Sequence, residues 1–347
     1  MQTTHRLLFK DSCTMDELRP GSINLVVTSP PYPMIAMWDD VFSLADASVA
    51  DHLAEGRGAE AFEQMHQQLD RVWAKLASAM AEGALACINI GDAVRSLGRR
   101  FRLYPNHARI ISAFSELGLE SLPLIIWRKP TNAPNKFMGS GVLPSGAYVT
   151  LEHEYILIFR KGSRRVFKTA EEKNNRRKSA LFWEERNSWY SDLWDFKGAR
   201  QGSSAGKEQR RLAAYPLELP FRLINMFSVY GDTVLDPFLG TGTTTIAAIA
   251  AGRNSIGYEQ ELQLRPIIEE RIAVEANGLG ALNLKRLDAH RCFVKKRLLE
   301  EKNFSHHNSN YNFPVITAQE KDLILFSPES IHPEADGIFK VFSQPLL

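Results

Sequence analysis

Thr28-Ser29-Pro30-Pro31-Tyr32 follows an apolar, β-branched run that ends at Val27 and is typical of a buried strand. Two consecutive prolines fix two φ angles, remove two N–H donors and keep Ser29 out of the helical region. The result is a rigid shelf with a hydroxyl before it and the Tyr32 ring after it. These groups suit a planar ring with an amino group, because the oxygens accept from the amino group and the ring stacks on Tyr32. The alternative is a turn that only ends a strand.

A second motif, far downstream, has the pattern of strand, glycine turn and helix. Thr233–Asp236 predicts the strand, Phe238-Leu239-Gly240-Thr241-Gly242-Thr243 the turn, and Ile246–Ala251 the helix. The glycines let the backbone approach a ligand closely, and the start of the helix offers free N–H groups. The next strand, Arg253–Tyr258, is closed by Glu259, which is placed to accept hydrogen bonds from ribose hydroxyls.

The residues of this turn can be compared with three kinds of nucleotide-binding site. A Walker loop needs a lysine, and Gly240–Thr245 has none, which argues against phosphate binding. A dinucleotide fingerprint needs a third glycine where Thr245 stands. The remaining kind binds a nucleoside without phosphates, such as S-adenosylmethionine, and Asp236 and Phe238 beside the glycines fit it. Asp11, after a short strand predicted at Arg6–Phe9, accepts from an amino group or a ribose hydroxyl, or only caps the next turn. A glycine turn without a ligand is the alternative.

Composition limits the class of protein. The 347 residues are 44% hydrophobic and can bury a large core, in one elaborate domain or two. The net charge is +2, so nucleic-acid affinity has to come from local clusters. Cys13, Cys87 and Cys292 lie far apart, which favours a reducing compartment and argues against disulfides or a zinc site. No run approaches the roughly 20 apolar residues of a membrane span. We expect a soluble, cytoplasmic protein without a metal.

The middle of the chain alternates helices and strands. Apolar residues recur at three- and four-residue spacing over one long helix, and glycines end both predicted helices. This order indicates crossover connections and a mainly parallel sheet, that is, an α/β, doubly wound, Rossmann-like fold. The predicted elements are the helices 60–80 and 104–117 and the strands 85–90, 122–127 and 154–160.

A basic segment follows the last of these strands. From Arg160 to Lys178 the chain has nine Lys or Arg and two Glu, and six aromatic residues follow up to Phe196. Such a segment suits contact with a phosphate backbone and insertion of side chains against bases. The alternative is a solvated basic loop beside a small aromatic core. The polar stretch 198–206 and the loop 128–148 are expected to take part in the same contact with nucleic acid. The predicted nucleic-acid contacts are Arg164, Arg165, Lys168, Arg176 and Arg177.

With both motifs in this order, the chain resembles the amino-directed DNA methyltransferases whose catalytic motif precedes the cofactor motif. The family's catalytic motif, Ser, Asn or Asp before Pro-Pro and an aromatic residue, is Ser29-Pro30-Pro31-Tyr32 here. The resemblance covers roughly residues 6–275 and includes Asn89–Asp92 and His153–Leu157. It implies S-adenosylmethionine as cofactor, bound by Asp11, Asp236, Phe238, Gly240, Thr241, Gly242, Thr243 and Glu259.

The resemblance implies direct methyl transfer to an exocyclic amino group of a base flipped out of duplex DNA. Ser29 Oγ and the Pro30 carbonyl would accept from the amino group, and Tyr32 would replace the lost stacking. Serine at this position is typical of the cytosine-N4 members, so we expect cytosine N4, with adenine N6 as the alternative. Methylation of the cytosine ring carbon needs a cysteine nucleophile after a proline, which no cysteine here provides.

The expected function is therefore site-specific DNA methylation in a restriction–modification system. A cognate restriction endonuclease would act on the same site without forming a stable complex. The alternatives are a methyltransferase acting on protein or RNA amides, which usually places the cofactor motif first, and an inactive DNA-binding relative. The predicted organisation is a catalytic half at 1–160, a target-recognition insert at 161–210, a cofactor-binding half at 211–288 and a small C-terminal extension at 289–347, which short apolar runs predict to be β.

Overall fold

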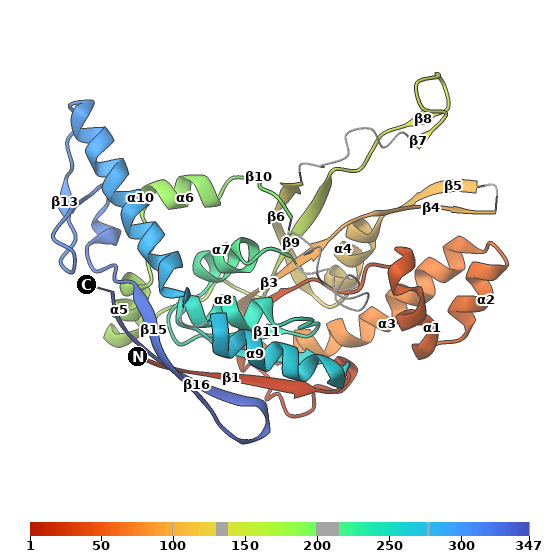
Figure 1. Cartoon of the computed structure of the whole chain (residues 1–347), viewed down its shortest axis with the longest axis horizontal. Helices are drawn as coiled ribbons and strands as arrows, with labels where there is room; N and C mark the ends of the chain where they lie inside the picture. Colours follow the sequence, from red (N-terminus) through yellow and green to blue (C-terminus); the bar gives the residue numbers. More distant parts are fainter. Residues whose placement is uncertain (99, 130–137, 199–214, 276–277, 347) are drawn as a thin grey trace.

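One large sheet carries both predicted motifs (Figure 1). The structure is a computed structural model that describes residues 1–98, 100–129, 138–198, 215–275 and 278–346. Within these residues the sheet has ten strands in the order β10-β6-β9-β3-β2-β11-β12-β1-β16-β15. The strands from β3 to β1 in this order are parallel to one another, whereas β9, β16 and β15 introduce antiparallel pairs.

The elements of the described residues are as follows. The sheet strands are β1 (Gln2–Phe9), β2 (Ile23–Thr28), β3 (Met80–Ile90), β6 (Leu119–Arg128), β9 (His153–Lys161), β10 (Leu193–Asp195), β11 (Thr233–Asp236), β12 (Asn254–Glu259), β15 (Phe326–Pro333) and β16 (Ile338–Pro345). Separate pairs are β4 (Ala93–Leu97) with β5 (Arg100–Tyr104), β7 (Met138–Gly139) with β8 (Ala147–Tyr148), and β13 (His306–His307) with β14 (Pro314–Val315). The helices are α1 (Asp39–Ala45), α2 (Ser48–Ala54), α3 (Gly58–Ala79), α4 (Asn106–Glu116), α5 (Ala170–Lys178), α6 (Trp183–Trp189), α7 (Glu218–Phe227), α8 (Thr243–Ala251), α9 (Arg265–Glu275) and α10 (Gly280–Leu299).

Helices cover both faces of the sheet. Side chains alternate between the faces of a strand, so Leu25 and Val27 of β2 pack in one core, with α7 and α8. Val26 of the same strand packs in the other core, with α3 and α4. The predicted α/β, doubly wound and mainly parallel fold is therefore confirmed.

The direction of β9 decides what lies at each edge of the sheet. It runs antiparallel to β3, so that Tyr155 lies opposite Ile90 and Arg160 lies opposite Leu85. Its first residues therefore lie at the carboxyl edge, where the parallel strands end. The chain leaves β9 at the amino edge, where Lys161 Nζ donates to the Met80 carbonyl at 2.8 Å. The basic segment that follows starts on this opposite side of the sheet.

The predicted insert and extension both add strands to the main sheet. In the insert, β10 pairs with β6. In the extension, β16 pairs with β1 and β15 and contains the apolar run 338–342 predicted as β, whereas the other apolar run, 323–326, reaches a strand only at Phe326. α10 crosses the predicted boundary at residue 288. The loop residues 130–137 and most of the polar stretch 198–206 lie outside the described residues. No helix of the described parts has the length and apolar character to span a bilayer.

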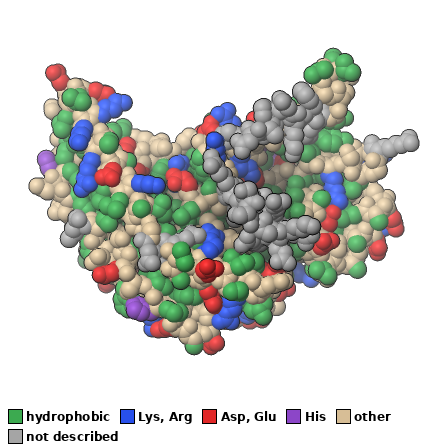
Figure 2. Space-filling view, viewed as in Figure 1, with side chains coloured by type: hydrophobic (Ala, Val, Ile, Leu, Met, Phe, Trp, Pro, Cys, Tyr) green, Lys and Arg blue, Asp and Glu red, His purple; other side chains and the backbone are tan. Residues whose placement is uncertain are grey.

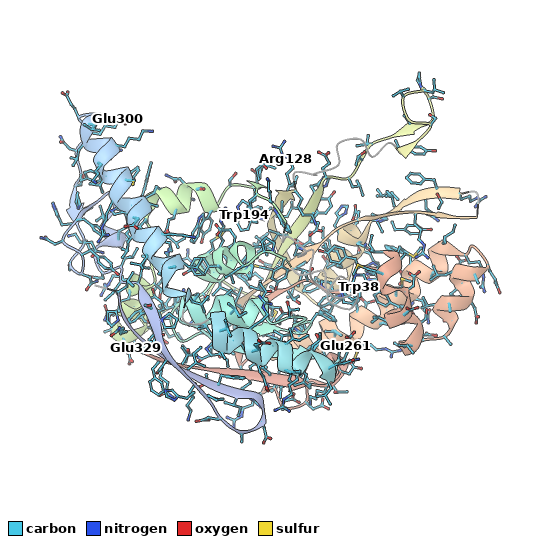
Figure 3. All side chains as sticks on the ribbon, in the orientation of Figure 1. Trp38, Arg128, Trp194, Glu261, Glu300 and Glu329 are labelled. Atoms are coloured by element: carbon cyan, nitrogen blue, oxygen red, sulfur yellow. The ribbon has the colours of Figure 1, made fainter. Side chains whose placement is uncertain are left out.

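The outline is hollowed above the carboxyl edge of the sheet. Figure 2 shows this hollow between the side of α10 and the side of the projecting strand pairs. Arg128 and Trp194, which belong to the paired strands β6 and β10, lie near each other at this edge (Figure 3). The Arg128 guanidinium forms an ion pair with Asp195.

Candidate active site

The carboxyl edge of the sheet gathers the ends of five neighbouring strands. β2 ends at Thr28, next to Ser29, and pairs with β3 on one side and β11 on the other. In turn, Asp236 of β11 lies opposite Gly257 of β12, and Phe9 of β1 lies opposite Glu259. The catalytic motif, the glycine turn, Glu259 and Asp11 therefore share one edge, which is where open α/β sheets bind ligands.

A chain of hydrogen-bonded hydroxyls leads away from the catalytic serine. Ser29 Oγ donates to the Tyr32 hydroxyl at 3.0 Å, and this hydroxyl donates to Glu154 Oε2 at 3.0 Å. Burial and the nearby Glu154 raise the pKa of Tyr32 well above its usual value, so Tyr32 keeps the proton that it donates. Because the Ser29 proton points toward Tyr32, lone pairs of Ser29 Oγ are left to accept.

Asn89 and Lys129 fix the carboxylate at the end of this chain. Asn89 Nδ2 donates to Glu154 Oε2 at 2.7 Å and to the Tyr32 hydroxyl at 2.8 Å, and it lies 3.5 Å from Ser29 Oγ. Lys129 Nζ forms an ion pair with the other Glu154 oxygen. Among the described residues the buried Asn89 Oδ1 has no hydrogen-bond partner, so it remains a free acceptor in the side chain that contacts Tyr32 and Glu154.

Gly91 makes room for this close packing. A Cβ on Gly91 would lie 3.1 Å from a ring carbon of Tyr32 and 3.2 Å from Glu154 Cγ. Buried Asn106 holds the same segment, because its Nδ2 donates to the carbonyls of Gly91 at 2.9 Å and Pro33 at 3.1 Å. Asn106 therefore ties Pro33, which directly follows the catalytic motif, to the segment that follows β3.

The roles of Asn89, Lys129 and Glu154 do not follow from the sequence alone. Asn89 and Glu154 belong to stretches that resemble the family, without an assigned role. The sequence signal that could have pointed to these three residues is that each is a polar residue in or beside a strongly apolar strand. What the sequence does not reveal is that β9 runs antiparallel, which is the reason its first residues reach the catalytic motif.

The Asp236 carboxylate is enclosed by donors. It accepts from Thr28 Oγ1 at 2.6 Å, from the Phe238 N–H at 3.0 Å, from the Tyr215 hydroxyl at 3.3 Å and from the Thr244 hydroxyl. Burial raises its pKa above the usual value, and these hydrogen bonds oppose that rise. Asp236 thereby links the end of β2 to the glycine turn. The ring of Phe238 packs edge-on against Trp73 at 5.7 Å.

The glycine turn has the space and the polar partner that a nucleoside needs. Gly240 has φ +54°, and a Cβ there would meet no atom within 4 Å. Its N–H donates to Glu259 at 2.8 Å. Burial raises the pKa of Glu259 to about 7, and the hydrogen bonds that its carboxylate accepts from the backbone N–H groups of Gly240 and Glu261 oppose this rise. Arg271 of α9 holds the turn by donating to the Thr241 carbonyl at 2.6 Å.

These residues fit S-adenosylmethionine. Glu259 carries the kind of acceptor that ribose hydroxyls need, Gly240 has an open side large enough for a ligand to approach, and Thr243 begins α8. Gly242, with φ +83°, packs against Ile268. Exposed Asp11 accepts the Cys13 N–H at 2.8 Å and so caps a short turn at Ser12–Thr14, the local role considered from the sequence.

The predicted nucleic-acid contacts lie at the other edge of the sheet. Arg165 forms an ion pair of 2.7 Å with Asp232, which directly precedes β11. Arg177 pairs with Asp322 at 3.0 Å, and the guanidinium groups of Arg165 and Arg176 lie over Phe167. The structure therefore does not bring the five residues Arg164, Arg165, Lys168, Arg176 and Arg177 to the catalytic motif. Their contact with DNA stays a prediction.

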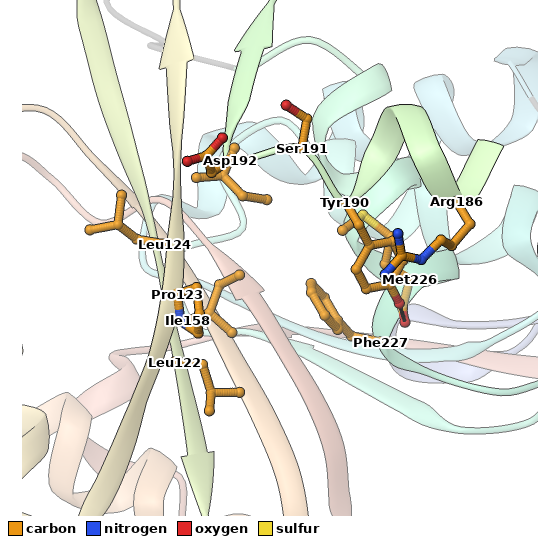
Figure 4. A pocket seen from close by; sticks show the side chains of 11 residues that line it. Leu122, Pro123, Leu124, Ile158, Arg186, Tyr190, Ser191, Asp192, Met226 and Phe227 are labelled. Carbon is orange, nitrogen blue, oxygen red and sulfur yellow. Dashed lines mark hydrogen bonds between the residues drawn. The ribbon is translucent and has the colours of Figure 1, made fainter. Parts of the chain in front are cut away.

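A separate pocket of about 270 Å³ lies between β6, α6 and the end of α7 (Figure 4). Apolar side chains line most of it, among them Leu122, Ile158 and Phe227, with Arg186 and Asp192 as charged groups. None of the predicted site residues lines this pocket. It is therefore distinct from the site at the carboxyl edge.

Comparison with known proteins identifies the family. The N6_N4_Mtase family model, described as DNA methylase, matches residues 23–270. The type II methyltransferase M.MthZI of Methanothermobacter thermautotrophicus is 49% identical over 346 residues, covering 99% of this chain and 96% of the relative. The type II methyltransferase M.MjaI of Methanocaldococcus jannaschii is 48% identical over 289 residues, covering 80% of this chain and 94% of the relative.

Solved structures agree with this assignment. The Thermus thermophilus protein TTHA0409, solved with S-adenosyl-L-methionine, has a TM-score of 0.60 and 33% identity, covering 78% of this chain and 95% of that protein. The PvuII DNA methyltransferase, which is cytosine-N4-specific, has a TM-score of 0.51 at 16% identity, covering 82% of this chain and 94% of that protein, and shows the shared fold alone. The chain belongs to the N6/N4 family of DNA methylases, and its cofactor is S-adenosylmethionine.

Proposed function

We propose that the enzyme methylates the exocyclic N4 amino group of cytosine at a specific site in duplex DNA. The observation that carries the proposal is the chain of hydrogen bonds from Ser29 through Tyr32 to Glu154. It leaves a neutral serine oxygen as acceptor for the amino group. Adenine N6 is the second candidate, because its amino group would meet the same acceptor.

The amino group of the base is a poor nucleophile because its lone pair is delocalised into the ring. Acceptance of its protons by Ser29 Oγ and the Pro30 carbonyl shifts the nitrogen toward tetrahedral geometry. Asn89 Oδ1 is a further acceptor in the pocket. Bound S-adenosylmethionine supplies the methyl group as an electrophile. The chain's own contribution is to position the base and stabilise the charge that develops on the nitrogen.

The nitrogen has to lose one proton when it gains the methyl group. Ser29 Oγ accepts this proton and passes its own proton to the Tyr32 oxygen. The Tyr32 hydroxyl passes its proton to Glu154 Oε2, so one proton leaves the base and one arrives at the carboxylate. The two transfers after the first each follow a hydrogen bond of 3.0 Å, from Ser29 to Tyr32 and from Tyr32 to Glu154.

For the cofactor, we propose a site at the turn from Gly240 to Thr243, between Glu259 and Asp11. Glu259 accepts from the ribose hydroxyls. The enclosed Asp236 contributes by holding Phe238 and the turn in place, since its carboxylate already accepts from four donors. The ring of Phe238 is expected to border the adenine.

The biological role we propose is protection of DNA in a restriction–modification system. Both long relatives are named type II methyltransferases. The cognate endonuclease would recognise the same site independently, without a stable complex with this enzyme. The catalytic half 1–160, the target-recognition insert 161–210, the cofactor-binding half 211–288 and the extension 289–347 remain the proposed functional divisions.

The test is the chemical identity of the product. DNA is methylated with the purified enzyme and S-adenosylmethionine, digested to nucleosides and analysed by mass spectrometry. N4-methylcytosine is the expected product. N6-methyladenine alone would overturn the assignment to cytosine and favour the second candidate. No methylated nucleoside, with cofactor binding intact, would favour an inactive DNA-binding relative.

A further inference from the structure

The β4–β5 hairpin follows β3 directly and begins close to the catalytic motif. β4 begins one residue after Asp92, in the polar stretch that starts at Asn89. β5 ends at Tyr104, two residues before Asn106, whose side chain binds the carbonyls of Gly91 and Pro33. Both ends of the hairpin are thus fixed to the segment that holds the catalytic motif. Its position relative to the target base is set by these contacts.

The hairpin carries positive charge and no negative charge. Residues 93–104 include four arginines and no Asp or Glu. Arg95 anchors the base of the hairpin through two hydrogen bonds of 2.7 Å to the Asp39 carboxylate. Arg100 and Arg102 are exposed, and in the described parts of the chain neither has a carboxylate partner. The Arg102 guanidinium lies 5.3 Å from the ring centre of Tyr104.

A second hairpin supports the first. The rings of Phe101 in β5 and Tyr148 in β8 stack with centres 4.4 Å apart and planes 11° apart. Both hairpins project from the same side of the molecule, beyond α4 (Figure 1). Residues 138–151 contain no charged residue, and Val142 and Leu143 are 79% and 65% exposed. The stack holds the arginine hairpin away from the body of the protein.

We infer that the β4–β5 hairpin contacts the phosphate backbone of the target duplex beside the flipped base, through Arg100 and Arg102. Exposed guanidinium groups without carboxylate partners are the chemistry that recognises phosphates. Phosphate contacts set the register of a protein on DNA. Because the hairpin is fixed to the segment that holds the catalytic motif, phosphate contacts by the hairpin would position that motif along the duplex. This surface lies at the carboxyl edge, in contrast to the basic segment around Arg164 and Lys168.

A second copy of the chain is the rival occupant of this surface, because Val142 and Leu143 expose apolar area. A symmetric dimer places the same patch on both partners. Arg100 and Arg102 would then be brought toward the same arginines of the other copy, with no carboxylate in the hairpin to compensate. Duplex DNA supplies the opposite charge, so the charge pattern favours DNA.

The test compares two variants that each remove two exposed positive charges. Arg100→Ala/Arg102→Ala alters the hairpin, and Arg19→Ala/Lys285→Ala alters two exposed positions that are not among the predicted nucleic-acid contacts. Binding of a fluorescein-labelled duplex is measured by anisotropy over a range of salt concentrations. The logarithm of the affinity falls with the logarithm of the salt concentration by about 0.9 per phosphate contact. The hairpin variant should therefore weaken binding and reduce this slope by about 1.8, while the other variant leaves it unchanged.

Two further measurements separate lost contacts from lost structure. Arg100→Lys/Arg102→Lys keeps both charges and should retain the salt slope. Calorimetric binding of S-adenosylmethionine should be the same in all variants, because the cofactor turn is distant in the chain and untouched. An unchanged slope in the hairpin alanine variant overturns the proposal. So does a reduced slope in the Arg19 and Lys285 variant alone, or a dimer in sedimentation that the hairpin substitutions dissociate.

Discussion

The Thr28 hydroxyl donates a 2.6 Å hydrogen bond to the Asp236 carboxylate, and both side chains are buried. Thr28 directly precedes Ser29, the proposed catalytic residue, and Asp236 lies two residues before Phe238, where the glycine turn begins. The two motifs are 208 positions apart from Thr28 to Asp236, and this bond joins them at the ends of the paired strands β2 and β11. Methyl transfer requires the base and the cofactor to be held in one alignment, so this bond serves catalysis through geometry.

Thr28→Val should therefore lower both stability and turnover. Valine keeps the shape of threonine but leaves a buried carboxylate one donor short, which costs about 1–3 kcal/mol of unfolding free energy. Denaturant unfolding and the turnover number check this. Thr4→Val in β1 makes the same chemical change where the hydroxyl has no hydrogen-bond partner within the described chain, and should have little effect on either quantity. Equal effects of the two substitutions would contradict the role of Thr28.

Glu259 should make cofactor binding depend on pH. Its pKa in the folded protein is about 7, against a usual value of 4.5. Ribose hydroxyls donate to the ionised carboxylate, so binding below this pKa has to release a proton. Affinity for S-adenosylmethionine should fall about tenfold per pH unit below the pKa and level off above it. Calorimetric titrations from about pH 6 to about pH 8 measure this directly.

Glu259 should have the opposite pH dependence in its effect on the stability of the cofactor-free protein. Between its unfolded and folded pKa values, the folded protein keeps a proton that the unfolded chain has lost. The contribution of Glu259 to stability is therefore greatest below its unfolded pKa and declines as the pH rises toward about 7. Glu259→Gln should remove both dependences, and a pH-dependent affinity that survives in this variant would show that another group is responsible.

The meeting of the strand ends at one edge of the sheet was predictable because each parallel strand has a clear sequence pattern. Apolar runs ended at Ser29, Asp236 and Glu259, and crossover helices separated them. In a parallel sheet these ends must lie at one edge, which brings the catalytic motif, the glycine turn and the acidic residue together. The fold and this half of the site therefore follow from local patterns.

The direction of β9 was not predictable in this way, and it decides two other features. An apolar strand has the same sequence pattern whichever way it runs. Because β9 runs antiparallel, Glu154 at its start reaches Tyr32, and the basic segment at its end lies at the opposite edge. Pairing with β3 determines that direction, and such pairing is a tertiary contact between distant parts of the chain.

Gly240→Val should abolish cofactor binding while the protein stays folded. At φ +54° a side chain is strained, and here it would project into the open space that the nucleoside needs. Gly231→Val is the matched control, because Gly231 has φ +79° and equally open surroundings away from the turn. Both variants should lose about 1–2 kcal/mol of stability from backbone strain. Only Gly240→Val should lose calorimetric binding, and retained binding would place the cofactor elsewhere.

Glu154→Gln should reduce turnover by about 100-fold, since it removes the final proton acceptor of the hydroxyl chain. Tyr32→Phe removes the middle hydroxyl and keeps the ring for stacking, so it should lower the turnover number to a similar extent. Both should leave the affinity for S-adenosylmethionine unchanged. Glu120→Gln is the control, because Glu120 also forms an ion pair, with Arg160 at the far end of β9.

The double variant Glu154→Gln/Tyr32→Phe then distinguishes a shared pathway from two separate roles. If both residues serve one proton path, the second substitution costs little once the first has interrupted the path, so the two effects are far from additive. Single-turnover rates at saturating cofactor, measured across pH, provide the readout. Additive losses with an unchanged pH profile would mean that Glu154 only orients Tyr32, and the proton would leave the base by another route.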